Sequence, residues 1–312
     1  SECLVGSEMC IRDRVIEDND FAYEIGAKLK NAGMIKSDTV WTWWMDRNYP
    51  DFTYYNGEYY LNAGMSYQDL AEKLQNPDIS HKKVKVTIPE GYTVFDIAST
   101  LEKKNVCSAK DFLKACSTTE GYDYDWLADF PKNDPHVGYI LEGFLFPATY
   151  DFGENSKATD IADAMLEAFD QRITDEVKTY CKQRGYTLYQ FVTLCSIVQK
   201  EALSKSSQGN IASTLENRLD KGMKIECDVT YYYAKALRDH GFSQSVYDAY
   251  YTYRCPGLPA GPIANPGTEI MTATVEHPST DYLYFFSDLK GDFHFAATYG
   301  EFESLKAKYP WK

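Results

Sequence analysis

Apolar residues recur with helical spacing in the segment that follows Thr187. One row repeats at i, i+4, i+7 and i+11: Phe191, Cys195, Val198 and Ala202. Leu194 and Ile197 form a second apolar row beside the first. The pattern predicts a buried helix, and Glu201 lies on or next to its apolar stripe because it follows Ile197 by four residues.

Glu201 is therefore a candidate general acid. Burial disfavours the charged form of a carboxyl group and raises its pKa, so that the group can still carry a proton near neutral pH. A protonated carboxylic acid is suited to protonating a glycosidic oxygen. From this segment alone a second interpretation stays open, in which Glu201 is a solvated residue that flanks a core helix and pairs with Lys200 or Lys205.

The N-terminal third contains an internal repeat. Residues 64–71 (GMSYQDLA) and 91–98 (GYTVFDIA) align position by position, and a degenerate third copy covers residues 21–29. Each clear copy has Ser or Thr three residues before Asp, which predicts a capped helix, and residues 84–88 alternate as a strand. This strand, turn and helix resemble a LysM-like module, which implies binding of N-acetylated glycans. A small scaffold that orients the rest of the chain is the alternative.

Further helices and one hairpin are predicted downstream. Helical patterns cover residues 111–115, residues 158–183 with a C-cap at Gly185, a segment that begins near Asn210 and contains Asn217 and Arg218, and residues 228–237. Residues 282–286 and 292–295 are predicted to be two strands of a hairpin. The expected fold class is α+β, with a small LysM-like N-terminal region over residues 15–107 and a mixed α/β catalytic domain over residues 108–312.

Composition and charge exclude several classes of protein. The chain has 312 residues, enough for two or three domains, and 44% hydrophobic content rules out general disorder. A net charge of −14 argues against a nucleic-acid partner, which needs a basic surface. The five His residues show no metal-ligand spacing and no Cys-x-x-Cys pair occurs, so neither a metal nor another cofactor is expected.

The start of the chain and its cysteines give three further expectations. Residues 6–13 back-translate into a sequence that resembles the end of a transposase sequencing adaptor, so residues 1–14 are interpreted as a sequencing artefact. An ordinary polar N-terminus is the alternative. No apolar run reaches the roughly 18 residues that span a bilayer. Six cysteines remain beyond this segment; their even number permits three disulfides that spacing cannot assign, and Cys195 is expected to be a buried thiol.

Several motif blocks follow one another in the C-terminal two thirds. LEGFLFPATY (residues 141–150) and GLPAGPIANPG (residues 257–267) predict tight, ordered loops because they are rich in Gly, Pro and aromatics. The other blocks are SIVQKEA (196–202), NRLDKGM with DVT (217–230), YYTY (250–253) and YLYF (282–285) with His294. In this order the blocks resemble the MltG (YceG-like) family of endolytic murein transglycosylases.

The resemblance implies both a reaction and a setting for it. The family's catalytic Glu falls on Glu201, which implies a lytic transglycosylase, a lyase that cleaves the MurNAc-GlcNAc bond of peptidoglycan and leaves a 1,6-anhydro end. It further implies a role in ending glycan strand elongation, a partner in the cell-wall synthesis machinery, and an extracytoplasmic location at the bacterial cell membrane. The family's N-terminal membrane anchor is expected to be missing from this chain.

Polar and aromatic residues of the same blocks are the candidate substrate contacts: Glu142, Tyr150, Asn217, Arg218, Asp228, Thr230, Tyr253, Asn265 and His294. We expect Glu201 at the floor of an open groove walled by residues 141–150 and 257–267, with Tyr150 and Tyr253 stacking on sugar rings. For each polar candidate the alternative is a structural contact, such as a buried loop contact, a helix cap or an ion pair.

Two departures from the family pattern leave other functions open. Gln199 stands where the family often has a second Glu, and Tyr251 replaces an Asn that could bind a sugar. One alternative is therefore a glycan-binding cell-wall scaffold that has lost activity. Another is a serine hydrolase that uses Ser196 with Lys200, although the chain has neither S-x-x-K spacing at this place nor a G-x-S-x-G elbow.

Overall fold

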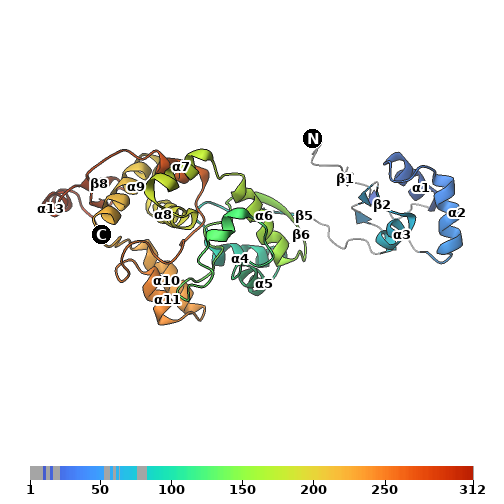
Figure 1. Cartoon of the computed structure of the whole chain (residues 1–312), viewed down its shortest axis with the longest axis horizontal. Coiled ribbons are helices and arrows are strands. Elements are labelled where there is room, and N and C mark those ends of the chain that lie inside the picture. Colours follow the sequence, from blue (N-terminus) through green and yellow to red (C-terminus); the bar gives the residue numbers. More distant parts are fainter. Residues whose placement is uncertain are drawn as a thin grey trace. The chain divides into compact units, whose positions relative to one another are not determined.

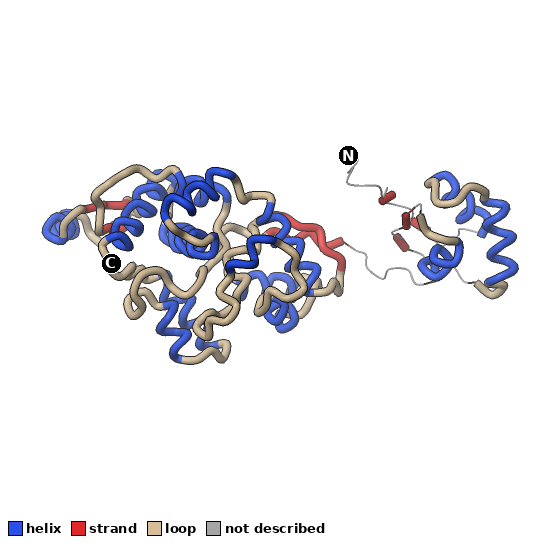
Figure 2. Tube along the Cα trace, in the orientation of Figure 1, coloured by secondary structure: helices blue, strands red, loops and turns tan. Residues whose placement is uncertain are grey.

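The structure is a computed structural model that describes residues 10–11, 15–16, 22–52, 57–58, 61–62, 64–75 and 83–311 (Figure 1). It divides the chain into two compact units, residues 1–83 and residues 84–312. Helices predominate in both units, and the strands occur in two-stranded pairs (Figure 2). This is an α+β architecture, as the sequence predicts.

The smaller unit packs three helices around Trp41. The helices are α1 (Ala22–Asn31), α2 (Asp38–Asn48) and α3 (Tyr67–Gln75). Two antiparallel pairs of short strands accompany them: β1 (Cys10–Ile11) with β4 (Leu61–Asn62), and β2 (Val15–Ile16) with β3 (Gly57–Glu58). The predicted cap of the first repeat is confirmed, because the Asp69 amide donates to Ser66 Oγ at 3.1 Å and the Ser66 amide donates to Asp69 Oδ2 at 3.0 Å.

Two expectations bear on the start of this unit. Ile25 and Leu29 of the degenerate third copy are buried in its core, whereas residue 21 lies outside the described residues. Within residues 1–14 the structure describes Cys10 and Ile11, which pair with β4. The interpretation of residues 1–14 as an artefact stays a prediction.

The larger unit contains most of the chain. Its helices are α4 (Val94–Lys103), α5 (Ala109–Ala115), the 3-10 helix η1 (Asp125–Asp129), α6 (Ala158–Asp170), α7 (Asp175–Arg184), α8 (Leu188–Glu201), α9 (Lys205–Asp220), α10 (Val229–Asp239), α11 (Gln244–Tyr250), α12 (Thr268–Val275) and α13 (Tyr299–Lys308). Strand β5 (Lys83–Thr87) pairs with β6 (Thr149–Gly153), and β7 (Tyr284–Ser287) forms the predicted hairpin with β8 (Phe293–Ala296). Four elements predicted from the sequence are thus confirmed: β5, α5, α10 and the hairpin.

The two clear repeat copies belong to different compact units. In the second copy, Thr93 and Asp96 form a capping box at the start of α4, and Ile97 and Leu101 pack into the core of the larger unit. The boundary between the two compact units lies at residue 83, whereas the sequence predicts a domain boundary at residue 107. The assignment of residues 15–107 to a LysM-like region stays a prediction.

The long helix predicted over residues 158–183 is wrong. The chain forms α6 and α7 instead, and Thr174 between them adopts an extended backbone and accepts a hydrogen bond from the Val177 amide. A Thr followed by Asp175 and Glu176 is a helix start, because the acidic side chains favour the positive end of the helix dipole. The predicted C-cap is confirmed, since Gly185 has φ 69°.

Helix α8 lies in the core of the larger unit, among α7, α9, α10 and α12 (Figure 1). Thr187 and Gln190 form a capping box at its start, and its residues from Phe191 to Val198 are buried. Phe144 stacks on Tyr189 in the first turn, with ring centroids 5.4 Å apart. The buried helix therefore fixes the place at which its last residue, Glu201, leaves the core.

The two Gly- and Pro-rich blocks form ordered loops, as predicted, and they also hydrogen-bond to each other. Asn265 Oδ1 accepts hydrogen bonds from the amides of Gly143 and Leu145, each at 2.9 Å, and its Nδ2 donates to Glu142 Oε1 at 2.7 Å. Gly143 has φ 93°, and a Cβ atom there would lie 2.5 Å from Pro262 Cβ. Only glycine fits this crossing of the two loops.

Cysteines and membrane segments give two short findings. The cysteines that lie in the described part of the larger unit are all free thiols, and Cys195 is buried as predicted. Among the described residues no helix is both long and apolar enough to cross a membrane.

Candidate functional site

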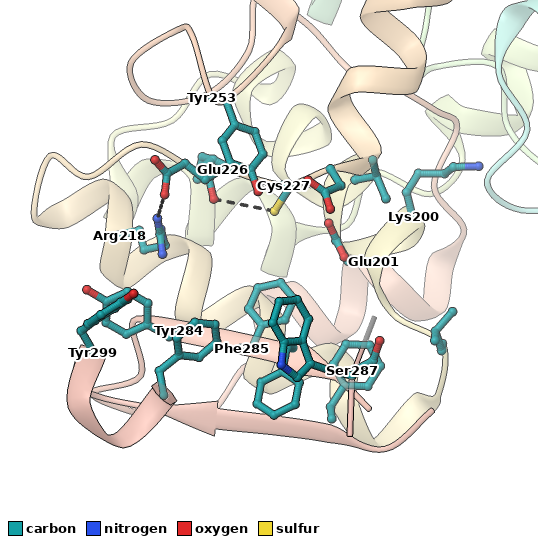
Figure 3. Close-up of a pocket in the computed structure, with 18 residues that line it drawn as sticks. Lys200, Glu201, Arg218, Glu226, Cys227, Tyr253, Tyr284, Phe285, Ser287 and Tyr299 are labelled. Atoms are coloured by element: carbon teal, nitrogen blue, oxygen red, sulfur yellow. Dashed lines mark hydrogen bonds and ion pairs between the residues drawn. The ribbon is translucent and has the colours of Figure 1, made fainter. Parts of the chain in front are cut away.

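Glu201 faces a pocket at the C-terminal end of α8 (Figure 3). Helix α8 ends here because the next residue, Ala202, has an extended backbone, with ψ 109°. The Glu201 side chain is half-buried and lines a cavity of about 560 Å³. A volume of this size is in the range of small-molecule and substrate pockets.

The environment keeps Glu201 protonated to a higher pH than a free Glu. Burial raises the pKa of its carboxyl group to about 7, and the nearby charge of Asp228 acts in the same direction. The Cys227 thiol and the Val229 amide act on the carboxyl group in the opposite direction and lower its pKa. The negative end of the α8 dipole also disfavours a carboxylate at this position. Near neutral pH Glu201 can therefore both donate and accept a proton.

One wall of the pocket is polar and follows the loop between α9 and α10. Glu226 in this loop has φ 52°, a left-handed conformation that is strained for a residue with a side chain. Arg218 holds the loop in place: its Nη2 donates to Glu226 Oε2 and its Nε donates to the Lys224 carbonyl, both at 2.8 Å. Its Nη1 donates to the Leu283 carbonyl, also at 2.8 Å, so Arg218 ties this loop to the hairpin segment.

Asp228 is the second acidic side chain next to Glu201. It occupies the N-cap position of α10 but makes no side-chain cap hydrogen bond, and it lines the pocket. Burial raises the pKa of the Tyr253 phenol, and a hydrogen bond from this phenol to Asp228 adds to the effect. Asp228 is therefore positioned to influence both Glu201 and a bound ligand.

The opposite wall is aromatic and comes from the hairpin and the C-terminal segment (Figure 3). Its residues are Tyr284, Phe285, Phe286, Phe293, Tyr299, Phe302 and Trp311. The rings support one another, since Phe302 stacks on Tyr284 with centroids 5.4 Å apart. The Glu201 carboxyl group thus shares its pocket with several aromatic rings. This arrangement suits a ligand with one apolar face and one polar edge.

Four of the predicted site residues come together in this pocket. They are Glu201, Arg218, Asp228 and Tyr253. The charge of Asp228 acts on the Glu201 carboxyl group, and both side chains line the pocket. Arg218 is mostly occupied by its structural hydrogen bonds. Tyr253 is the one of the two preferred stacking candidates that lines the pocket.

Three predicted substrate contacts are corrected by the structure. Glu142, Thr230 and Asn265 have no exposed surface, so they cannot touch a ligand in this conformation. Glu142 accepts a hydrogen bond from the Val94 amide at 2.8 Å, and burial raises the pKa of its carboxyl group to about 7. Thr230 Oγ1 donates to the Cys227 carbonyl at 2.7 Å and so helps to fix the loop beside Glu201.

Three other candidates lie outside the lining of this pocket. Asn217 Nδ2 donates to the carbonyls of Thr280 and Tyr282, each at 2.9 Å. The Tyr150 hydroxyl donates to the Phe146 carbonyl at 2.5 Å. His294 Nε2 lies 2.8 Å from Asp288 Oδ2. These contacts are structural, and a substrate-binding role for the three residues stays a prediction that the pocket does not support.

The predicted walls of the groove are also corrected. Neither residues 141–150 nor residues 257–267 contribute to the lining of the pocket. The second block packs along α8 instead, since the Ile263 amide donates to Ser196 Oγ at 3.0 Å and the Gly267 amide donates to Gln199 Oε1 at 3.1 Å. The loops thus hold the helix that carries Glu201, and the hairpin and α13 supply the wall.

The serine hydrolase alternative does not fit the geometry. Ser196 is fully buried, and its hydroxyl donates to the Thr193 carbonyl at 2.7 Å. Lys200 Nζ donates to the Gly91 carbonyl at 3.3 Å, so it is engaged elsewhere. Within the described part of the chain, no group of three or more His, Cys, Asp or Glu side chains could hold a metal ion.

Sequence reasoning missed the aromatic wall and the neighbours of Glu201. Tyr284, Phe286 and Phe293 are predicted from the sequence only as strand residues. The many aromatic residues in these two strands were the signal that could have indicated a binding surface. Glu226 and Cys227 stand between motif residues, and no spacing rule predicts that the loop turns them toward α8.

Comparisons with known proteins identify similar chains. The model of the YceG-like family matches residues 15–308. The chain is 28% identical over 299 residues to the endolytic murein transglycosylase of Streptococcus pneumoniae serotype 2 (strain D39), covering 88% of this chain and 54% of that protein. It is 29% identical over 296 residues to the endolytic murein transglycosylase of Bacillus subtilis (strain 168), covering 91% and 81%. The chain thus spans about half the length of the pneumococcal relative.

A solved structure has the same fold. The 2.6 Å crystal structure of a yceG-like protein from Listeria monocytogenes superposes with a TM-score of 0.61 at 28% sequence identity. The superposition covers 96% of this chain and 100% of the Listeria chain.

Proposed function

Because the chain belongs to the YceG-like family, we propose that it is an endolytic lytic transglycosylase that cleaves the MurNAc-GlcNAc bonds of peptidoglycan and leaves 1,6-anhydro-MurNAc ends. The observation that carries the proposal is a half-buried Glu201 whose pKa is raised to about 7 and whose carboxyl group faces an aromatic wall. Such a group can act as general acid and then as general base near neutral pH.

In the proposed reaction Glu201 serves both proton transfers. Its carboxyl group protonates the oxygen that leaves C1 of MurNAc, and the bond between C1 and this oxygen breaks. The C6 hydroxyl of the same sugar then attacks C1 and gives its proton to the Glu201 carboxylate. No water is consumed, and the intramolecular nucleophile replaces a second carboxylate through its high effective molarity.

The other carboxylates of the pocket are engaged in ways that suit this mechanism. Hydrolytic glycosidases pair an acid with a second carboxylate that acts as nucleophile or base. Glu226 is bound by Arg218 at 2.8 Å, and Asp228 accepts a hydrogen bond from the Tyr253 phenol. We therefore assign Asp228 an electrostatic role toward Glu201 and toward the positive charge that develops at C1.

Digestion of peptidoglycan in water enriched in ¹⁸O distinguishes the proposed lyase from a hydrolase. A transglycosylase product carries no label at C1, because the new bond is made by the C6 oxygen of the sugar. Mass spectrometry of the released muropeptides should therefore find unlabelled anhydro products. Label at the reducing ends would mean hydrolysis, and no release of glycan at all would favour the glycan-binding scaffold.

The setting of the activity is part of the proposal. We propose that the protein acts on the extracytoplasmic side of the bacterial cell membrane, where its cleavage would help to end glycan strand elongation beside the cell-wall synthesis machinery. The LysM-like repeats would bind or orient the strand. The curated relatives named as endolytic murein transglycosylases support the peptidoglycan substrate by similarity.

A further inference from the structure

Exposed large apolar side chains of the larger unit gather around the pocket. Among its described residues, six such side chains are well exposed, and four of them line the pocket: Leu203, Tyr253, Tyr299 and Trp311. Tyr232 and Leu289 are equally exposed but do not line it. Single exposed apolar residues need no explanation, whereas a cluster beside a carboxyl group indicates a binding surface.

Helix α13 carries ring faces that core packing does not explain. It has no buried residue, and it packs against the hairpin through contacts such as Phe302 on Tyr284. Tyr299 is 60% exposed and Trp311 is 47% exposed, although both line the pocket. Lys306 Nζ lies 3.9 Å from the centroid of the Trp311 ring, a cation–π contact that restricts its rotation. The Trp311 ring is therefore held in place, and both rings remain open to a ligand.

We propose that Trp311 and Tyr299 form a stacking platform for a pyranose ring of the bound glycan strand, opposite the polar wall that carries Glu201. A β-1,4-linked N-acetylhexosamine has an apolar face of C–H groups and a polar edge of hydroxyl and acetamido groups. The apolar face would lie on the rings. The polar edge would face Asp228 and Glu226, which line the other side of the pocket. This subsite deepens the proposed function and rests on it.

The match to the family does not cover the whole of this platform. The matched region ends at residue 308, so Trp311 lies beyond it. Tyr150 and Tyr253 were the stacking candidates that the motif blocks indicated, and of these Tyr253 alone lines the pocket. The platform follows from the exposure of the two rings and from their place in the lining of the pocket that Glu201 also lines.

Binding of tetra-N-acetylchitotetraose to the full chain tests the platform without cleavage. All variants carry Glu201→Gln, so that binding is measured by calorimetry in the absence of turnover. Trp311→Ala should weaken binding about tenfold to a hundredfold, as is usual for loss of a buried aromatic anchor, and Tyr299→Ala about fivefold. Trp311→Phe should restore most of the affinity. Tyr232→Ala and Leu289→Ala are matched controls and should stay within about twofold of the Glu201→Gln background.

The outcomes separate this proposal from the proposed function. Binding that Trp311→Ala leaves within about twofold would overturn the platform, even if the parent protein releases anhydro products. Loss of binding in Trp311→Ala together with a parent that releases no products would keep the platform and overturn the lyase assignment. Absence of any chitotetraose binding would overturn the platform as well. Because α13 buries no residue, unchanged melting temperatures should show that the variants are folded.

Discussion

Glu201→Gln should stabilise the protein at alkaline pH, and the size of the effect follows from the site. The pKa of Glu201 is about 7 in the folded chain and 4.5 as the ordinary value. A raised carboxyl pKa means that the folded state binds the proton more tightly than the unfolded state. The contribution of Glu201 to stability is therefore full below pH 4.5 and is lost as pH rises toward 7.

The magnitude follows from the linkage relation. Between about pH 5 and about pH 8 the parent protein should lose about 2 kcal/mol through Glu201 alone, because one pKa unit corresponds to about 1.4 kcal/mol. Gln has nearly the same shape but does not titrate, so Glu201→Gln should escape this loss. Glu142 also has a pKa raised to about 7, and it contributes a loss of the same sign in both proteins.

Urea unfolding followed by circular dichroism at the two pH values measures the effect. The difference between parent and Glu201→Gln cancels the contributions of Glu142 and of the smaller unit, which are common to both. The variant should gain about 2 kcal/mol relative to the parent on going from about pH 5 to about pH 8. Equal pH dependence of the two proteins would refute the argument, since Glu201 would then titrate as it does in the unfolded chain.

Two further predictions concern the neighbours of Glu201 and the loop crossing. Asp228→Asn removes a negative charge that raises the Glu201 pKa, so the alkaline limb of the pH–activity profile should move to lower pH. The activity near pH 8 should fall about threefold. Tyr253→Phe is the control, because it keeps the Asp228 charge and should leave the alkaline limb in place. Gly143→Ala should lower the free energy of unfolding by about 3 kcal/mol, because Gly143 has φ 93° and the added methyl group would collide with Pro262. Gly291→Ala is the control: Gly291 has a similar φ of 87° but open space around it, so the substitution should cost about 1 kcal/mol. Urea unfolding measures both values.

Local sequence signals predicted helix α8 well. Thr187, the apolar rows and Glu201 all act within one helix, so a periodicity of 3.6 residues determines which side chains share a face. The hairpin and the caps at Ser66 and Thr93 could also be predicted, because each depends on residues that are close together in the sequence. The break at Thr174 was missed because the apolar pattern continues across it, although Thr followed by two acidic residues is a local start signal.

The composition of the pocket walls could not be predicted in the same way. Glu142 and Asn265 are distant in the sequence, but a hydrogen bond of 2.7 Å joins them where the two Gly- and Pro-rich loops cross in the interior. Motif residues can be required for such a crossing as well as for ligand binding, and one sequence does not separate the two. The aromatic wall depends on how α13 folds back on the hairpin, which is a tertiary contact that no periodicity encodes.

The rate at which anhydro-muropeptides are released from purified peptidoglycan tests whether Glu201 is the proton-transferring residue. Glu201→Gln should lower the rate by at least about 10²-fold with the fold intact, because the same residue acts as acid and then as base. Glu142→Gln is the matched control, since its carboxyl pKa is also raised to about 7 but its side chain is buried away from the pocket; it should keep activity within about tenfold of the parent. Release by Glu201→Gln within about tenfold of the parent rate would contradict the account.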